Sequence, residues 1–172
     1  MEPNLNASSV ALVSICLWLI ASLAGFARPA WGTRMSAFLS AVGCLVCLGS
    51  AFFEAGSFQL PRWIGIAGQE WRFQADSLSR WFLALIGLVC FAATLYGPGY
   101  LKHLKGKARP GLVWSGLAIL FASMVGVVTS PNAIGFFVFW ELMALSSFLL
   151  VATDHERQSV RRAAFIYLGA TR

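Results

Sequence analysis

Five long apolar runs, separated by short polar stretches, dominate the pattern of hydrophobic and polar positions along the chain. Each run is long enough to cross a hydrocarbon core of about 30 Å as a helix, because a helix rises about 1.5 Å per residue. The pattern therefore predicts an all-α integral membrane protein with five transmembrane helices. The runs are Ala7–Phe26, Met35–Phe53, Leu78–Tyr96, Leu112–Thr129 and Asn132–Ala152.

The polar stretch between the second and third runs has a pattern of its own. Residues 70–74 alternate polar and apolar, which is the period of a half-buried strand. Ser57–Leu60 could pair with them across a turn region that contains Pro and Gly. We therefore expect a short extracytoplasmic β-hairpin between the second and third helices.

The last part of the chain predicts the start of a sixth helix. The polar stretch Thr153–Arg162 is followed by the apolar run Ala163–Ala170. About ten apolar residues give about 15 Å of helix, half of what a span needs. The expectation is one membrane domain over residues 1–172, either with a last helix that folds back at the interface or as the N-terminal portion of a longer, truncated protein.

Composition supports the membrane assignment and excludes several other classes. The chain is 58% hydrophobic and 12% charged, with a mean hydropathy of +0.72, whereas soluble domains carry about 25% charged residues. The net charge of +6 does not indicate nucleic-acid binding, because the basic residues lie between the apolar runs. Cys44 and Cys47 form a C-x-x-C within an apolar run and have no second ligand pair, so we expect no metal. No nucleotide motif is present either, and we expect no cofactor.

The basic residues predict the orientation of the chain in the membrane. With the N-terminus outside, nine Lys and Arg side chains lie on the inner side and three on the outer side. We therefore expect a multi-pass protein of the cell inner (plasma) membrane with an extracytoplasmic N-terminus. The inner set is Arg28, Arg34, Lys102, Lys105, Lys107, Arg109, Arg157, Arg161 and Arg162, and the outer set is Arg62, Arg72 and Arg80.

Glu141 is the residue most indicative of function, because it lies almost midway along the fifth apolar run. A charged group at that depth costs about 3 kcal/mol or more. A carboxyl group that switches between states there suits a proton path. The alternative is a protonated carboxyl that only bonds a neighbouring helix. The other four runs hold no Lys, Arg, His or acidic residue near mid-depth, so the sequence predicts that a charged partner lies outside this chain as written.

Asp76 precedes the third apolar run and has two interpretations. An Asp before a helix accepts hydrogen bonds from backbone N–H groups and suits the helix dipole, so it is a candidate helix cap. A role at the outer mouth of an ion path is the second possibility.

Two motifs resemble those of a known family. Residues 73–82 resemble the F-x-x-D-x-L-S-x-x-F start of the third helix in the antiporter-like subunits of complex I. Residues 140–151 resemble the W-E-x-M-x-L-x-S-x-x-L-V motif of that family's fifth helix. The sequence of Met143–Phe148 most closely resembles that of the large membrane subunit of hydrogenase-4 and formate hydrogenlyase complexes.

This resemblance implies the N-terminal portion of a proton-translocating subunit of the complex I and Mrp antiporter superfamily. Glu141 would be its proton-relay carboxylate, paired with a lysine of a later, broken helix. The implied partners are the lipid bilayer and the other membrane and redox subunits of a hydrogenase or complex I-like assembly, which would carry the electron transfer. Two alternatives remain: a subunit of a Mrp-type cation/proton antiporter, and an inactive truncated membrane stub.

Overall fold

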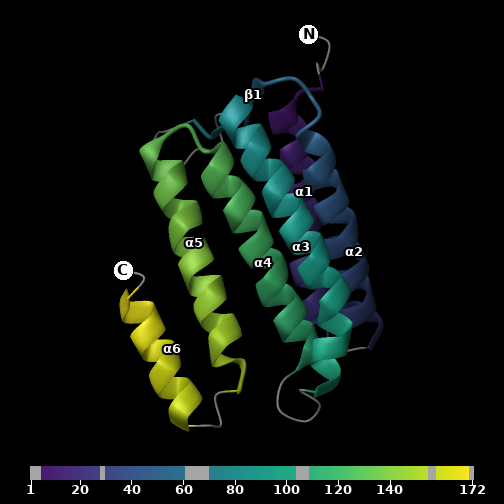
Figure 1. The fold of residues 1–172 in the computed structure, drawn as a ribbon, viewed down its shortest axis with the longest axis vertical. Coiled ribbons are helices and arrows are strands. Elements are labelled where there is room, and N and C mark those ends of the chain that lie inside the picture. The colour runs from purple at the N-terminus through teal and green to yellow at the C-terminus, as the bar shows by residue number, and fades with distance from the viewer. Residues whose placement is uncertain (1–4, 28–29, 61–69, 104–108, 155–157, 171–172) are drawn as a thin grey trace.

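The computed structural model describes residues 5–27, 30–60, 70–103, 109–154 and 158–170. Five helices in these ranges are long and apolar enough to cross a membrane, which confirms the predicted all-α membrane fold (Figure 1). A 3-10 turn, η2 (Ala152–Asp154), leads from the fifth of them to the shorter helix α6 (Gln158–Ala170). The five long helices are α1 (Ala7–Phe26), α2 (Ala30–Ser50), α3 (Ser77–His103), α4 (Pro110–Thr129) and α5 (Ala133–Val151).

The helix boundaries differ from the predicted apolar runs where polar residues continue a helix. α2 begins at Ala30 rather than Met35, because Arg34 can extend its side chain toward water from a helical backbone. α3 continues through Pro98 to His103, well beyond the predicted end at Tyr96. The stretch between the third and fourth apolar runs is therefore helical in its first part, and its Lys105 and Lys107 lie outside the described residues.

The helices run up and down, and α4 lies between α3 and α5 (Figure 1). α1 packs mainly against α2 and α4, and α2 packs against α3. The fully buried Trp18 of α1 joins these helices: its indole Nε1 donates to the Ser40 carbonyl of α2 at 3.2 Å, and its ring meets Phe121 of α4 edge-on at 5.8 Å. The core of the bundle thus lies around α1.

Small residues allow a close crossing of α1 and α4. A Cβ at Gly111 of α4 would collide with the Gly25 carbonyl oxygen of α1, so the two backbones touch there. One turn further along α4, the Ser115 hydroxyl donates to the Ser22 carbonyl of α1 at 2.8 Å. A larger side chain at either glycine would separate α1 from α4.

The predicted hairpin is present. Strand β1 (Gly56–Gln59) pairs antiparallel with β2 (Arg72–Ala75), with Phe58 opposite Phe73. The Leu60 N–H donates to the Trp71 carbonyl at 2.8 Å and extends the pairing. In β2, Phe73 and Ala75 are buried while the intervening residues are exposed, which is the alternation that predicted the strand.

The connections lie at two opposite ends of the bundle. The start of α1, the hairpin and the α4–α5 turn are at one end, called here the hairpin end and drawn at the top of Figure 1. The last residues of α1, α3 and α5 and the first residues of α2, α4 and α6 are at the other end, called the basic end. α6 turns back from the basic end and runs beside the lower half of α5. Among the described basic residues, Arg34, Lys102 and Arg109 are at the basic end and Arg72 and Arg80 are at the hairpin end, as in the orientation argument. Which end faces the cytoplasm stays a prediction.

Candidate functional site

The fifth helix begins with a side-chain cap. Asn132 follows the short Ser130–Pro131 turn, and its side-chain oxygen accepts from the Gly135 N–H at 2.7 Å. The Ser130 hydroxyl donates back to the Gly126 carbonyl of α4 at 2.7 Å. These bonds satisfy backbone N–H and C=O groups that would otherwise lack a hydrogen-bond partner at the helix ends, so they stabilise the α4–α5 turn.

Glu141 lies near the middle of α5, about 12 Å along the helix axis from its first residue. Its side chain is exposed on the surface of the described chain. Of the residues one turn away, Phe137, Val138 and Leu145 are 64%, 40% and 42% exposed, whereas Ala144 at the edge of this face is buried. Glu141 therefore sits in an apolar surface stripe that points away from α4.

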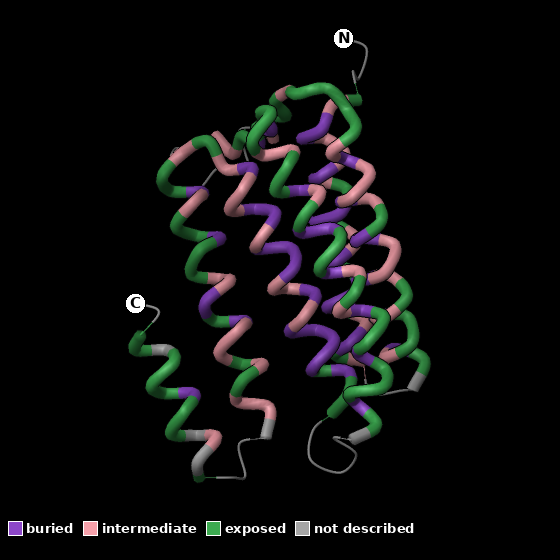
Figure 2. The backbone as a smooth tube through the Cα atoms, in the orientation of Figure 1, coloured by how far each residue is buried: buried purple, intermediate pink, exposed green. Residues whose placement is uncertain are grey.

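The outward orientation of α5 is a property of the whole helix. Only 17% of its apolar window is buried, against 61% for α4 (Figure 2). The buried minority, which includes Phe139 and Ala144, faces α4, where the Phe139 ring fills the space left by Gly126. The carboxylate thus lies on a face that lipid or further protein would cover in the membrane.

α6 approaches α5 below the level of Glu141. The Phe148 and Phe165 rings are 6.3 Å apart, and the Tyr167 hydroxyl lies 3.0 Å from the Ser147 hydroxyl, to which it donates. These contacts hold the two helices together on the side toward the basic end (Figure 1).

An aromatic cluster links the hairpin to the half of α5 that carries Glu141. The Trp71 ring meets the Phe139 ring edge-on at 5.6 Å, and Phe73 lies 6.0 Å from the same ring. The Asn132 side-chain amide also donates to the Glu70 carbonyl at 3.5 Å. The alternation of polar and apolar residues predicted that Trp71 and Phe73 lie on a strand. It did not predict that their rings pack against Phe139 of α5.

Asp76 has the geometry of a helix cap at the start of α3. Its Oδ1 accepts from the Ser79 N–H at 2.7 Å, and this backbone hydrogen bond is the main cause that lowers the pKa of the carboxyl group. Ser79 also donates through its hydroxyl to the Val128 carbonyl of α4 at 3.1 Å. Arg80 Nε donates to the Ala51 carbonyl just beyond α2 at 2.9 Å, a contact that sequence reasoning missed.

The structure does not bring the two predicted acidic residues together. Asp76 is at the hairpin end beside α3, Glu141 is midway along α5, and α4 lies between these helices (Figure 1). Within the described ranges no three His, Cys, Asp or Glu side chains gather in a way that could hold a metal ion. Cys44, Cys47 and Cys90 are buried free thiols, and Cys16 is an exposed one.

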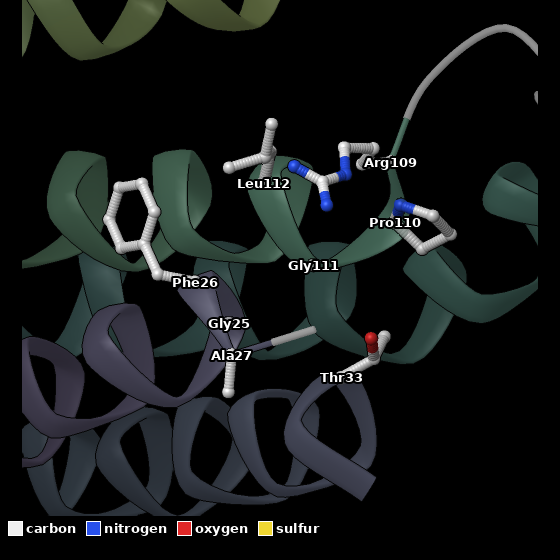
Figure 3. A pocket seen from close by; sticks show the side chains of 8 residues that line it. All are labelled: Gly25, Phe26, Ala27, Thr33, Arg109, Pro110, Gly111 and Leu112. Atoms are coloured by element: carbon white, nitrogen blue, oxygen red, sulfur yellow. The ribbon is translucent and has the colours of Figure 1, made fainter. Parts of the chain in front are cut away.

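A cavity of about 230 Å³ lies at the basic end (Figure 3). Arg109 and Thr33 contribute its polar side chains, from the start of α4 and from the first turns of α2. The other lining residues are Gly25, Phe26, Ala27, Pro110, Gly111 and Leu112.

The fold and the position of Glu141 together define a multi-pass helical membrane protein with an acidic residue at membrane depth. No family model matches the chain. It is 27% identical over 169 residues, 85% of its length, to NAD(P)H-quinone oxidoreductase chain 5 of Synechocystis sp.. It is 31% identical over 111 residues, 64% of its length, to NAD(P)H-quinone oxidoreductase subunit 5, organellar chromatophore 1, of Paulinella chromatophora.

A third relative comes from a different kind of system. The chain is 36% identical over 95 residues, 55% of its length, to the putative antiporter subunit mnhA2 of Staphylococcus saprophyticus. The matched regions are 24%, 15% and 12% of the three relatives, so the chain spans a quarter or less of their length. These similarities agree with the resemblance to complex I and Mrp antiporter-like membrane subunits.

Proposed function

We propose that this chain is part of a proton-translocating membrane subunit of a quinone oxidoreductase-like complex, and that Glu141 is a proton-relay carboxylate in it. The observation that carries the proposal is the position of Glu141: mid-helix, on an outward face of α5, within the W-E-x-M pattern. An ionisable side chain at this depth is costly, and such residues usually line ion or proton paths.

The surroundings of Glu141 support this role. An ionisable side chain on a membrane-facing surface is costly, and residues of this kind usually face protein or a water-filled path. In the assembled complex this face of α5 therefore adjoins protein or water, which gives the carboxyl group a route for its proton. The aromatic cluster of Trp71, Phe73 and Phe139 holds the same half of α5, so the carboxyl group is carried on a positioned helix.

Replacing Glu141 with Gln in the complete, assembled complex tests the proposal. Proton pumping should be abolished while assembly is retained, because the amide has nearly the same shape but cannot release a proton. Glu141→Asp should keep partial pumping, and Glu54→Gln, at an exposed carboxylate beside the hairpin, is the matched control and should pump normally. Unchanged pumping in Glu141→Gln would contradict the proposal.

A Mrp-type cation/proton antiporter subunit is the second candidate, favoured by the similarity to the putative antiporter subunit. It uses the same carboxylate without redox chemistry. Cation-driven proton movement in vesicles that lack an electron donor would favour the antiporter, whereas movement that requires quinone reduction would favour the oxidoreductase.

The finer assignments are also part of the proposal. The sequence of Met143–Phe148 supports a relationship to the large membrane subunit of hydrogenase-4, which would place the chain in an assembly with other membrane and redox subunits. The chain would lie in the inner membrane with the hairpin end outside, as the distribution of basic residues favours. A neighbouring gene for a nickel–iron hydrogenase or Fe–S subunit would distinguish a hydrogenase assembly from an antiporter cluster.

A further inference from the structure

The cavity at the basic end lies where three spanning helices end. Its lining residues come from the end of α1, the first turns of α2 and the start of α4. Each of these helices supplies a span of 20 residues, or about 30 Å, so the ends of the spans reach the boundary of the hydrocarbon core. The cavity therefore lies at the level of the lipid headgroups.

Two side chains that line the cavity can donate hydrogen bonds to a ligand. Arg109 is the N-cap residue of α4, but its exposed side chain makes no capping hydrogen bond. Within the described part of the chain, no hydrogen bond or ion pair joins the Arg109 guanidinium or the Thr33 hydroxyl to another side chain. A guanidinium has a permanent positive charge and a planar set of N–H donors that matches the oxygens of a phosphate group. These two groups therefore favour an anion with several acceptor oxygens.

The space beside these donors is large enough for a phosphate group. Gly111 lines the cavity without a side chain, and a Cβ built there would lie 3.5 Å from the Thr33 Oγ1. The cavity volume of about 230 Å³ equals about seven water molecules at about 30 Å³ each. A phosphate group and the first carbon atoms attached to it fit in this volume.

The charge around the cavity also favours an anion. None of the described residues that line it is acidic, and Asp154, in the turn after α5, is not among them. Arg34 of α2 and Lys102 of α3 lie at the same end of the bundle as Arg109. Because the effective dielectric constant is lower beside protein and hydrocarbon than in water, these positive charges attract an anion more strongly there.

The remaining part of the wall is apolar and faces away from the bundle. Phe26 is 59% exposed and Leu112 is 43% exposed. Figure 3 shows the Arg109 guanidinium extending along the start of α4 toward Leu112, with the Phe26 ring on the same side of the helices. A free phosphate ion would not use an apolar wall, whereas a phospholipid joins a phosphate group to acyl chains and matches both parts of the lining. Basic pockets between membrane helices are typical sites for anionic lipid headgroups.

We propose that this cavity binds the headgroup of an anionic phospholipid, with the phosphate group on Arg109 and Thr33 and the start of an acyl chain along Phe26 and Leu112. The site is formed by α1, α2 and α4 and does not depend on the proposed relay at Glu141. A lipid bound there joins the ends of three helices, so it stabilises the folded bundle.

Thermal unfolding of the full, delipidated chain in neutral detergent micelles tests the site. Phosphatidylglycerol should raise the Tm in a saturable manner, because it binds the folded chain and not the unfolded one. Phosphatidylcholine, which has no net charge, should raise the Tm far less at the same concentration, and inorganic phosphate should leave it unchanged. An equal rise with inorganic phosphate would overturn the assignment to a lipid, and an equal rise with phosphatidylcholine would overturn the preference for an anion.

Variants of the lining residues place the lipid in the cavity. Arg109→Gln should weaken phosphatidylglycerol binding by about ten-fold or more, because it removes the charged hydrogen bonds to phosphate. Arg109→Lys keeps the charge but loses the planar donors, so its affinity should be intermediate. Arg34→Gln is the matched control, since Arg34 is an exposed basic residue at the same end that does not line the cavity, and it should change the affinity much less. Equal weakening in Arg109→Gln and Arg34→Gln would mean that the lipid responds only to the overall charge, and would overturn the proposal.

Discussion

The packing of α2 against α3 depends on the absence of a side chain at Gly87. A Cβ built there would lie 2.6 Å from the Leu48 nitrogen and 2.8 Å from its Cα. These are backbone atoms, so they cannot rotate away as the end of a side chain can. Restoring an ordinary separation of about 3.5 Å in Gly87→Ala requires the helices to move apart by about 1 Å.

The energetic effect follows from two opposing contributions. Overpacking of a close helix contact costs about 1–3 kcal/mol. Ala is favoured over Gly within a helix by about 1 kcal/mol, which offsets part of that cost. At Gly49 of α2 an added Cβ would have no atom within 4 Å, so Gly49→Ala gains the helix preference of Ala without the cost of overpacking. The difference between the two variants should therefore be about 1–3 kcal/mol, with Gly87→Ala the less stable.

Equilibrium unfolding in mixed micelles, followed by far-ultraviolet circular dichroism, measures both variants against the parent chain. The Cys47 thiol, which lies 3.5 Å from the Leu83 carbonyl of α3, reports on the same interface and should become more reactive toward thiol reagents in Gly87→Ala. Equal stability of Gly87→Ala and Gly49→Ala would refute the assignment of a close α2–α3 approach at this position.

Three further predictions concern the hairpin end and the orientation. Phe139→Ala should destabilise the chain by about 3 kcal/mol or more in thermal unfolding, because it removes the ring on which the hairpin packs; a change no larger than that of an exposed Phe would contradict this. Asp76→Ala should lower stability at neutral pH, with the difference from the parent vanishing in acid. Because the pKa of Asp76 is lower in the folded than in the unfolded chain, its ionised carboxylate stabilises the fold above the unfolded pKa of about 3.9. This stabilisation is lost as the pH falls through the folded pKa. A stability difference between the variant and the parent that stays unchanged in acid would contradict a contribution from the ionised carboxylate. An impermeant maleimide added outside intact cells should label Gln59→Cys but not Arg109→Cys, and the reverse pattern would invert the topology.

The candidate site was partly accessible from sequence. Glu141 stood out because a lone carboxylate in an apolar run is costly, and this argument needs no structure. The contacts of Arg80 with Ala51 and of Phe139 with Trp71 could not be found this way, because they join residues 29 and 68 positions apart.

The sequence by itself determined the five spans, the hairpin and the depth of Glu141. It did so because apolar run length, strand alternation and the cost of a buried charge are local properties. Only the tertiary structure decided which side of each helix is covered. Apart from Glu141, Ser146 and Ser147, α5 has apolar or small residues on every side, and lipid is as apolar as a protein core. The pattern of its apolar residues therefore does not tell the face toward α4 from the face toward the membrane. That Glu141 points outward, and that α4 beside it is the most buried of the five long helices, follows from packing alone.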